Sequence, residues 1–259
     1  MSGVSVEDRD GARWITLDRP DCRNALDPDV LGALRAGVDG AVAAGARAIV
    51  LVGRGGAFCS GADLRYAVAQ GPALRDNLET HLGHFQDLVR AIVSSPLPSI
   101  AAVDGVAYGF GCDLALACDL RVATSRAYFQ EGFVRIGLIP DGGGTWMLPR
   151  LVGLSKALEL TLLGEKLDAA AALHLGLVAR VVAPDELDAA VTAVADKLVN
   201  GPPLAIAHIK RLVRAGLSKP FDEAFRDEGR AQAECLRSDD CVEGITAFFQ
   251  KRPPAFSGR

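Results

Sequence analysis

Residues 99–119 read SIAAVDGVAYGFGCDLALACD and decide the fold class. The first five are small or apolar and predict a strand buried on both faces. A glycine-rich turn (105–111) follows and opens an apolar helix (112–118). Glycine in such a turn permits positive φ angles and lets the backbone approach a ligand closely. Strand, glycine turn and helix in this order predict an α/β architecture.

The same order occurs elsewhere in the first two thirds of the chain. Strands are predicted at 13–17, 46–53 and 120–123, and a helix at 28–44. Two more glycine-rich segments, 53–61 and 141–144, each precede a helix. The spacing predicts a long helix (72–93) with one apolar face, formed by Leu74, Leu78, Leu82, Phe85, Val89 and Ile92. His81 and His84 are predicted on its polar side as a surface pair.

From about Asp168, a plausible helix N-cap, the pattern becomes mostly helical. Helices are predicted at residues 185–199, 203–215, 221–236 and 242–251. Asn200-Gly201-Pro202-Pro203 interrupts this region. We therefore expect a core of residues 1–197 and a helical segment of residues 198–259.

Composition and charge exclude several classes of protein. Hydrophobic residues make up 49% of the 259 residues and the net charge is −4, with no basic tract. We expect no nucleic-acid partner and no membrane partner, because no apolar run approaches the ~18 residues of a membrane span. The six cysteines form no CxxC pair, so we expect reduced thiols and no metal site. The polar N-terminus is unlike a signal peptide, and a cytoplasmic location is expected.

The glycine-rich turns also suggest chemistry. The first N–H groups of a helix have no partner within the helix and carry its positive dipole end. Two such groups that converge on one carbonyl oxygen would form an oxyanion hole, worth about 3 kcal/mol per donor. The simpler alternative is that the glycines only tighten the turns between strands and helices.

Several motifs together resemble the crotonase (enoyl-CoA hydratase/isomerase) superfamily. They are AFCSGADL (57–64), the turn and helix of 104–119, Arg19-Pro20 with Asn24-Ala25-Leu26, GLIPDGGGT (137–145), and later landmarks up to AFFQKR (247–252). The resemblance covers nearly the whole chain in order. It implies a spiral of repeated ββα units, followed by a helical C-terminal segment that packs trimers, often paired as hexamers.

The resemblance also implies the binding residues for an acyl-CoA thioester. The oxyanion donors would be the N–H groups of Ala62 and Phe110. Residues that match family positions lining the coenzyme A site are Ala62, Asp63, Leu64 and Arg65, with Arg23 and Ala25 as weaker candidates. Phe248 and Lys251 match positions from which a neighbouring subunit contacts coenzyme A. Their alternative is a core aromatic and a solvated lysine on a C-terminal helix.

The acid–base residues depart from the hydratase pattern. Hydratases of the family use two glutamates; here the first position is Asp113 and the second is Phe133, which cannot exchange a proton and is expected to bind substrate instead. Isomerase members carry an aspartate at the position of Asp141, which shuttles a proton. The alternative roles are a helix cap for Asp141 and a favourable dipole contact for Asp113. Glu131 could also reach the site.

The sequence therefore predicts an acyl-CoA isomerase without a metal or redox cofactor, in which coenzyme A is part of the substrate. Asp141 would move the proton, helped by Asp113, and the product would be a shifted double bond or an isomerised ring. One alternative is a 2-enoyl-CoA hydratase that uses Asp113 alone. Another is a catalytically weak protein that binds coenzyme A or serves assembly.

Overall fold

Two sheets form the centre of the molecule in the computed structural model, which describes residues 3–72 and 76–259. The larger sheet has the strand order β1 (Val4–Arg9), β2 (Ala12–Leu17), β3 (Ala48–Gly53), β5 (Ser99–Val103), β7 (Leu120–Thr124) and β10 (Arg180–Val182). The smaller has the order β4 (Ala57–Cys59), β6 (Val106–Tyr108), β8 (Tyr128–Gln130) and β9 (Leu167–Asp168). Apart from the β1–β2 and β8–β9 pairs, neighbouring strands are parallel.

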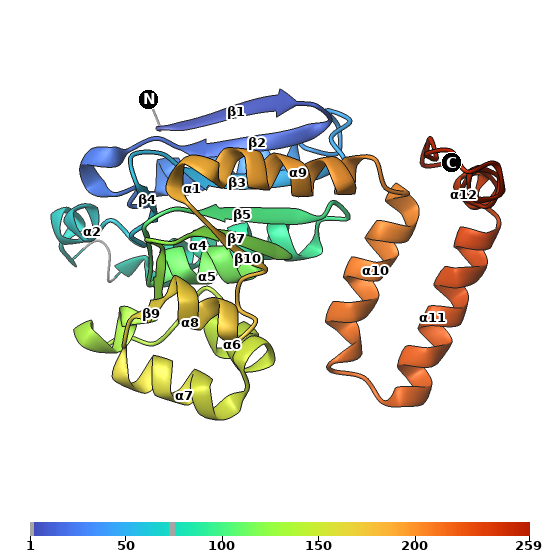
Figure 1. Cartoon of the computed structure of the whole chain (residues 1–259). Coiled ribbons are helices and arrows are strands. Elements are labelled where there is room, and N and C mark those ends of the chain that lie inside the picture. The colour runs from blue at the N-terminus through green and yellow to red at the C-terminus, as the bar shows by residue number, and fades with distance from the viewer. Residues whose placement is uncertain (1–2, 73–75) are drawn as a thin grey trace.

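A repeated unit builds both sheets. The chain lays one strand in the larger sheet, turns, lays a three-residue strand in the smaller sheet, and then forms a helix. The pairs β3–β4, β5–β6 and β7–β8 follow this order. Figure 1 shows the first strands of these pairs, β3, β5 and β7, stacked one below the other in the larger sheet. The expected spiral of ββα units is confirmed.

The helices cover the sheets and form the C-terminal segment. They are α1 (Pro28–Asp39), α2 (Leu64–Gln70), α4 (Leu78–Ser94), α5 (Phe110–Ala117), α6 (Gly144–Val152), α7 (Leu154–Leu163), α8 (Ala169–His174), α9 (Leu187–Val199), α10 (Pro203–Gly216), α11 (Phe221–Leu236) and α12 (Asp239–Gln250). Short 3-10 turns lie at η1 (Pro20–Cys22), η2 (Gly132–Ile136) and η3 (Pro184–Glu186).

Some predicted boundaries were wrong for a physical reason. The segments predicted as glycine-rich turns contain β4 and β6, whose three residues are too few to show a periodic pattern. Helix α1 ends at Asp39 instead of residue 44. The predicted apolar face of the long helix is also wrong in its first half, because Leu78 and Leu82 are exposed. Leu74 lies outside the described residues.

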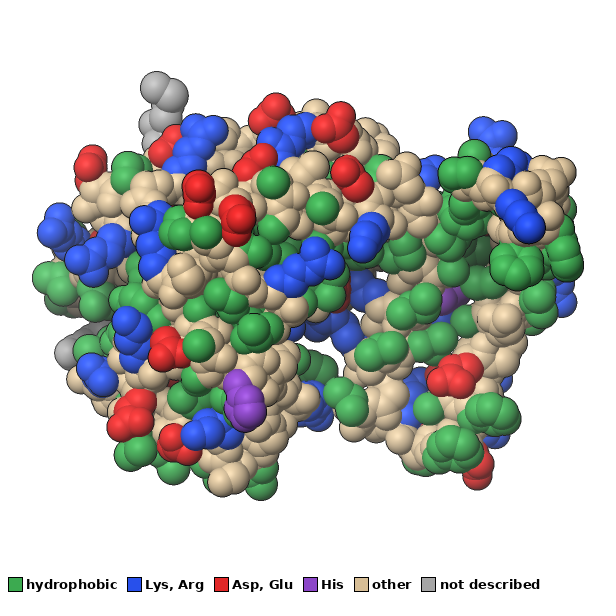
Figure 2. Space-filling view, in the orientation of Figure 1, with side chains coloured by type: hydrophobic (Ala, Val, Ile, Leu, Met, Phe, Trp, Pro, Cys, Tyr) green, Lys and Arg blue, Asp and Glu red, His purple; other side chains and the backbone are tan. Residues whose placement is uncertain are grey.

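Helices α10, α11 and α12 extend from one side of the sheets (Figure 1). Helix α9 passes the predicted boundary at residue 197 and ends at Val199, and the interruption at Asn200 leads into α10. Figure 2 shows hydrophobic side chains gathered over these C-terminal helices. In the described part of the chain, no helix is long and apolar enough to cross a membrane.

Candidate active site

The first candidate oxyanion donor is the Ala62 N–H, in a loop held on both sides by backbone hydrogen bonds. The Leu26 N–H donates to the Gly61 carbonyl and the Asp63 N–H donates to the Leu26 carbonyl, each at 2.8 Å. Leu26 and Ala62 thereby form a parallel bridge. Within residues 3–72 and 76–259, the Ala62 N–H itself has no hydrogen-bond partner. The loop therefore presents a fixed, unused donor.

The second candidate donor is the Phe110 N–H, at the first position of α5. No carbonyl of the helix can accept a hydrogen bond from this position. Gly109 precedes it with a φ of 54°. The Phe110 ring is buried and meets the Phe85 ring edge-on, with centroids 4.7 Å apart and an interplanar angle of 78°. This packing fixes the backbone of the turn.

The two loops touch each other. Gly61 has a φ of 86°, and a Cβ atom at this position would lie 2.7 Å from the Tyr108 carbonyl oxygen and 3.2 Å from the Phe110 nitrogen. Any side chain here would separate the loops. Glycine therefore brings both unused amides into one small region, as an oxyanion hole requires.

Asp113 lies one turn further along α5 and holds the turn that leads into α6. The carboxyl group is fully buried, and its Oδ2 accepts the Gly142 N–H at 2.9 Å. A Cβ atom at Gly142 or Gly144 would collide with Asp113, so the close approach depends on both glycines. Burial raises the pKa of Asp113 well above its usual range, and the charge of Glu131 adds to this, while the Gly142 N–H opposes it.

Asp141 does not cap the helix that follows it. Helix α6 begins after Gly143, and no side chain among the described residues caps it. The Oδ1 atom of Asp141 is buried and has no hydrogen-bond partner in the described chain. Burial raises the pKa of this carboxyl group. The alternative of Asp141 as a helix cap is therefore wrong, and its Oδ1 atom remains free for other contacts.

Phe133 lies beside the second loop. Its ring approaches Gly109, where a Cβ atom would lie 3.8 Å from the Phe133 Cζ. The phenyl ring offers neither a proton donor nor an acceptor there. Glu131, two residues earlier, is buried beside α5.

A left-handed turn presents Arg23 beside the first loop. Arg23 and Asn24 have φ angles of 53° and 59°. The buried Asn24 amide holds this turn by donating to the carbonyl oxygens of Arg54 and Ala57 at 3.0 and 2.7 Å. The Ser60 N–H donates to the Arg23 carbonyl at 3.0 Å. Asn24 thus fixes two segments that carry candidate binding residues.

The other residues predicted to contact coenzyme A differ in their exposure to solvent. Leu64 is 53% exposed and Arg65 is also exposed, so both face solvent at the start of α2. The Asp63 carboxylate caps α2 by accepting the N–H groups of Arg65 and Tyr66 at 3.1 and 3.2 Å. Ala25 is buried. Asp63 and Ala25 therefore shape the loop, while Leu64 and Arg65 can reach a ligand.

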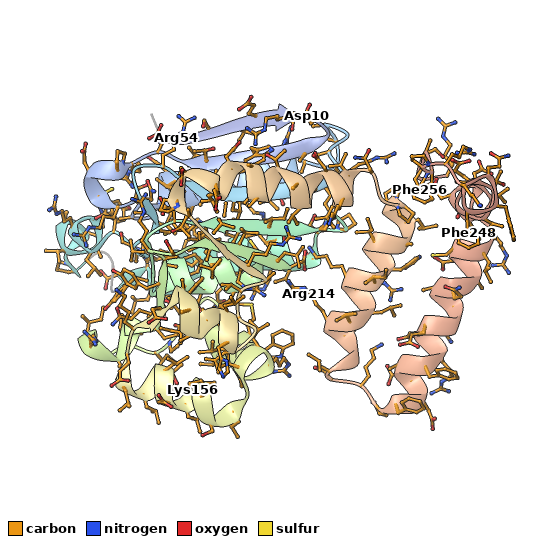
Figure 3. The ribbon with its side chains drawn as sticks, viewed as in Figure 1. Asp10, Arg54, Lys156, Arg214, Phe248 and Phe256 are labelled. Atoms are coloured by element: carbon orange, nitrogen blue, oxygen red, sulfur yellow. The ribbon has the colours of Figure 1, made fainter. Side chains whose placement is uncertain are left out.

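Phe248 and Lys251 lie far from these loops within one chain. Figure 3 shows Phe248 on α12, a helix that lies well away from the sheets. Phe248 is 77% exposed, so its alternative as a core aromatic is wrong. Lys251 ends α12 with a φ of 53°. A single chain does not bring either residue to the oxyanion loops.

Sequence reasoning missed a row of rings that leads to the second donor. The Tyr66 ring stacks on His81 with centroids 6.3 Å apart, and His81 meets Phe85 edge-on at 5.4 Å. Phe85 then contacts Phe110. His81 is therefore half-buried among these rings, and its predicted place on the polar side of the long helix is wrong. Burial lowers the pKa of His81. The i, i+4 spacing of His81 and Phe85 was the signal that could have revealed this face.

Over residues 3–72 and 76–259, no group of three or more histidine, cysteine, aspartate or glutamate side chains is arranged to hold a metal ion. Cys59 and Cys112 are buried, and burial raises the pKa of both thiols, that of Cys59 to about 12. Both thiols therefore remain protonated at neutral pH.

Known proteins resemble this chain over its whole length. The sequence profile described as enoyl-CoA hydratase/isomerase matches residues 7–259. A probable enoyl-CoA hydratase of Rhodobacter capsulatus is 44% identical over 257 residues, which cover 99% of this chain and 98% of that protein. The 1,2-epoxyphenylacetyl-CoA isomerase of Escherichia coli is 35% identical, with 96% of each chain covered. The crystal structure of an enoyl-CoA hydratase from Bacillus anthracis matches with a TM-score of 0.95 at 30% identity, covering 99% of this chain and 100% of that one.

Proposed function

The chain belongs to the enoyl-CoA hydratase/isomerase family, and we propose that it acts there as an acyl-CoA isomerase. The reaction would move a double bond between 3-enoyl-CoA and 2-enoyl-CoA, or isomerise a ring in a related thioester. The observation that carries this proposal is the Oδ1 atom of Asp141, which is buried and has no hydrogen-bond partner in the described chain, next to the turn that Asp113 holds. A carboxylate oxygen without a hydrogen-bond partner is suited to proton transfer.

The proposed reaction begins with binding of the thioester oxygen by the N–H groups of Ala62 and Phe110. Asp141 then takes a proton from C2 of a 3-enoyl-CoA, and the electron pair moves onto the thioester oxygen to give a dienolate. The two amides stabilise this oxygen by about 3 kcal/mol each. Asp141 returns the proton to C4, and the double bond comes to lie between C2 and C3. No atom is gained or lost.

Two features of Asp141 support its role. Burial raises its pKa, which makes the carboxylate a stronger base near neutral pH. Its neighbour Gly142 contacts the Phe110 ring closely enough to exclude a Cβ atom. The base is therefore on a segment packed against the residue that provides the second oxyanion donor. Because electrons move only within the substrate, this reaction needs no redox cofactor and no metal.

Hydration of 2-enoyl-CoA is the second candidate, and the Rhodobacter capsulatus relative, a probable enoyl-CoA hydratase, favours it. A hydratase must deliver water to C3 and a proton to C2. Phe133 cannot serve either step, and Asp113 is fully buried with one oxygen engaged by Gly142. These observations weigh toward isomerisation. A catalytically weak protein that only binds coenzyme A is the third possibility.

Assembly into a trimer, or a pair of trimers, is part of the proposal. Large apolar side chains are exposed on all three C-terminal helices, among them Ile209, Val213, Phe221, Phe225 and Phe248. Apolar surface of this extent is typical of an interface. A neighbouring subunit would then bring Phe248 and Lys251 to coenzyme A, which they do not reach within their own chain.

A panel of 2-enoyl, 3-enoyl and aromatic coenzyme A thioesters tests the function. Products are resolved by mass spectrometry and chromatography. Isomerisation gives a new product of unchanged mass, and this is the expected result with a 3-enoyl or ring substrate. A product heavier by one water from 2-enoyl-CoA, with no isomerisation, would establish the hydratase instead. Tight binding of acetoacetyl-CoA without any turnover would favour the binding protein.

A further inference from the structure

Glu131 is a buried carboxyl group that the proposed reaction does not use. It is 2% exposed and lies between β8 and η2. Neither carboxyl oxygen has a hydrogen-bond partner within residues 3–72 and 76–259. The adjacent Gln130, by contrast, donates its amide N–H to the Gly164 carbonyl at 2.7 Å. Burial of an unpaired carboxyl group is costly, so packing alone gives no reason for a glutamate here.

The groups around Glu131 offer no counterion. A cavity of about 10 Å³ adjoins it, too small for an acyl chain, and its walls are Cys112, Phe129, Gln130, Glu131, Leu148, Leu160, Glu165, Leu167 and Leu177. The carboxyl groups of Asp113 and Asp141 interact with that of Glu131 by charge repulsion, without a hydrogen bond. The Cys112 thiol faces the carboxyl group.

Two arginines donate to carbonyl oxygens at or next to these walls. Arg121 donates to Leu177, and Arg135 donates to Gly164. In the described part of the chain, the titratable groups around Glu131 are thus the acids Asp113, Asp141 and Glu165 and the Cys112 thiol, and no cation there neutralises it.

The carboxyl groups of Asp113 and Glu131 are buried and that of Asp141 is half-buried, and burial together with like charge opposes the ionisation of all three at neutral pH. Burial raises the pKa of Glu131 to about 7; the Cys112 thiol opposes this rise, and the charge of Asp141 adds to it. Asp113 also has a raised pKa, but its anion accepts the Gly142 N–H. Glu131 accepts no backbone N–H, so a proton shared between Asp113 and Glu131 is favoured on Glu131.

We propose that Glu131 is a positioning residue that acts through Asp113. By keeping its proton, Glu131 allows Asp113 to remain an anion and to hold the amide of Gly142. That bond fixes the turn that carries Asp141. When Glu131 ionises, two adjacent anions repel each other and the turn loses its fixed position. The inference rests on the proposed role of Asp141 as the proton shuttle.

Replacement Glu131→Gln tests this, because glutamine keeps the shape and cannot ionise. Isomerase turnover is measured from pH 5.5 to 9 for the parent, for Glu131→Gln and for Glu165→Gln. Glu165 borders the same cavity but is exposed, so it serves as the control. The parent should lose turnover as the pH rises through about 7. In Glu131→Gln the ratio of turnover at pH 8.5 to that at pH 6.5 should rise by about tenfold, while Glu165→Gln should follow the parent.

Thermal unfolding gives a second readout. The folded-state pKa of Glu131 is raised above its ordinary 4.5, so its contribution to stability is fully present below pH 4.5 and is lost as the pH rises through about 7. Glu131→Gln should therefore melt higher than the parent at pH 8.5, by roughly 4–8 °C, with a much smaller difference at pH 5. A purely structural glutamate would give a constant difference at every pH.

The outcomes separate the two proposals. If Asp141→Asn abolishes turnover but Glu131→Gln leaves the pH profile of the parent unchanged, the role of Glu131 is refuted and that of Asp141 stands. If Glu131→Gln removes the alkaline loss of turnover but Asp141→Asn remains active, the acid cluster serves a base other than Asp141, and the proposed function is wrong. An equal loss of turnover and melting temperature at every pH would also refute positioning by Glu131.

Discussion

Replacement of Asp119 with asparagine should destabilise the whole chain, because Asp119 joins the core to α10. Its Oδ1 accepts two hydrogen bonds from the Arg214 guanidinium, at 2.7 and 3.0 Å. Its Oδ2 lies 2.9 Å from the Lys210 Nζ and also accepts the Ser99 N–H at 2.8 Å. Figure 3 shows Arg214 between α10 and the sheets. One carboxylate thus holds two cations of the C-terminal segment.

The magnitude follows from the burial of Lys210. Its side chain is 6% exposed, and its other acceptors are the carbonyl oxygens of Ile92 and Leu97, at 2.9 and 2.8 Å. Burial lowers the pKa of Lys210, and the Asp119 charge opposes this. Without that charge a buried cation loses its counterion, which costs about 3–5 kcal/mol. The melting temperature should fall by roughly 10 °C.

Circular dichroism melting at pH 7 measures this effect. The matched control is Asp188→Asn, which breaks the exposed ion pair with Arg9 and should cost less than about 1 kcal/mol. The double variant Asp119→Asn with Lys210→Met should recover part of the loss, since it removes the unpaired cation. An Asp119→Asn variant that melts no lower than the Asp188→Asn control would refute the argument.

Three further predictions concern the site and the assembly. Replacing Ala62 or Phe110 with proline removes one N–H donor and should lower turnover on the order of 10²-fold. Circular dichroism must show that the variant is folded. Turnover within a few-fold of the parent would show that the amide is not an oxyanion donor. Light scattering should give a trimer or hexamer mass, and a monomer at micromolar concentration would contradict the role proposed for Phe248. Cys59 should resist alkylation at pH 8 in the folded protein, because burial raises its thiol pKa to about 12; rapid labelling without unfolding would show that it is accessible.

The local parts of the fold could be predicted from the sequence. Strand β5 and helix α11 were predicted within their observed bounds, because a continuous apolar run and a helical repeat are visible in adjacent residues. The positions of the glycine-rich turns were also visible. The strands β4 and β6 were missed, because three residues show no period.

The parts that depend on tertiary packing could not be predicted. Sequence spacing offered Asp141 as the cap of the following helix, but the turn before that helix is held by Asp113, which comes from α5. The burial of Glu131 and the ion pairs of Asp119 likewise depend on segments distant in sequence. Their partners become visible only when the helices are packed around the sheets.

The proton shuttle is the central claim, and Asp141→Asn tests it most directly. Turnover of a 3-enoyl-CoA to 2-enoyl-CoA is measured for the parent and the variant, together with the affinity for acetoacetyl-CoA and the melting temperature. Asparagine keeps the size of the side chain but cannot accept the proton. Turnover should fall by roughly 10²–10⁴-fold, while affinity and folding change little, because both oxyanion amides remain. An Asp141→Asn variant that isomerises within a few-fold of the parent rate would contradict the account.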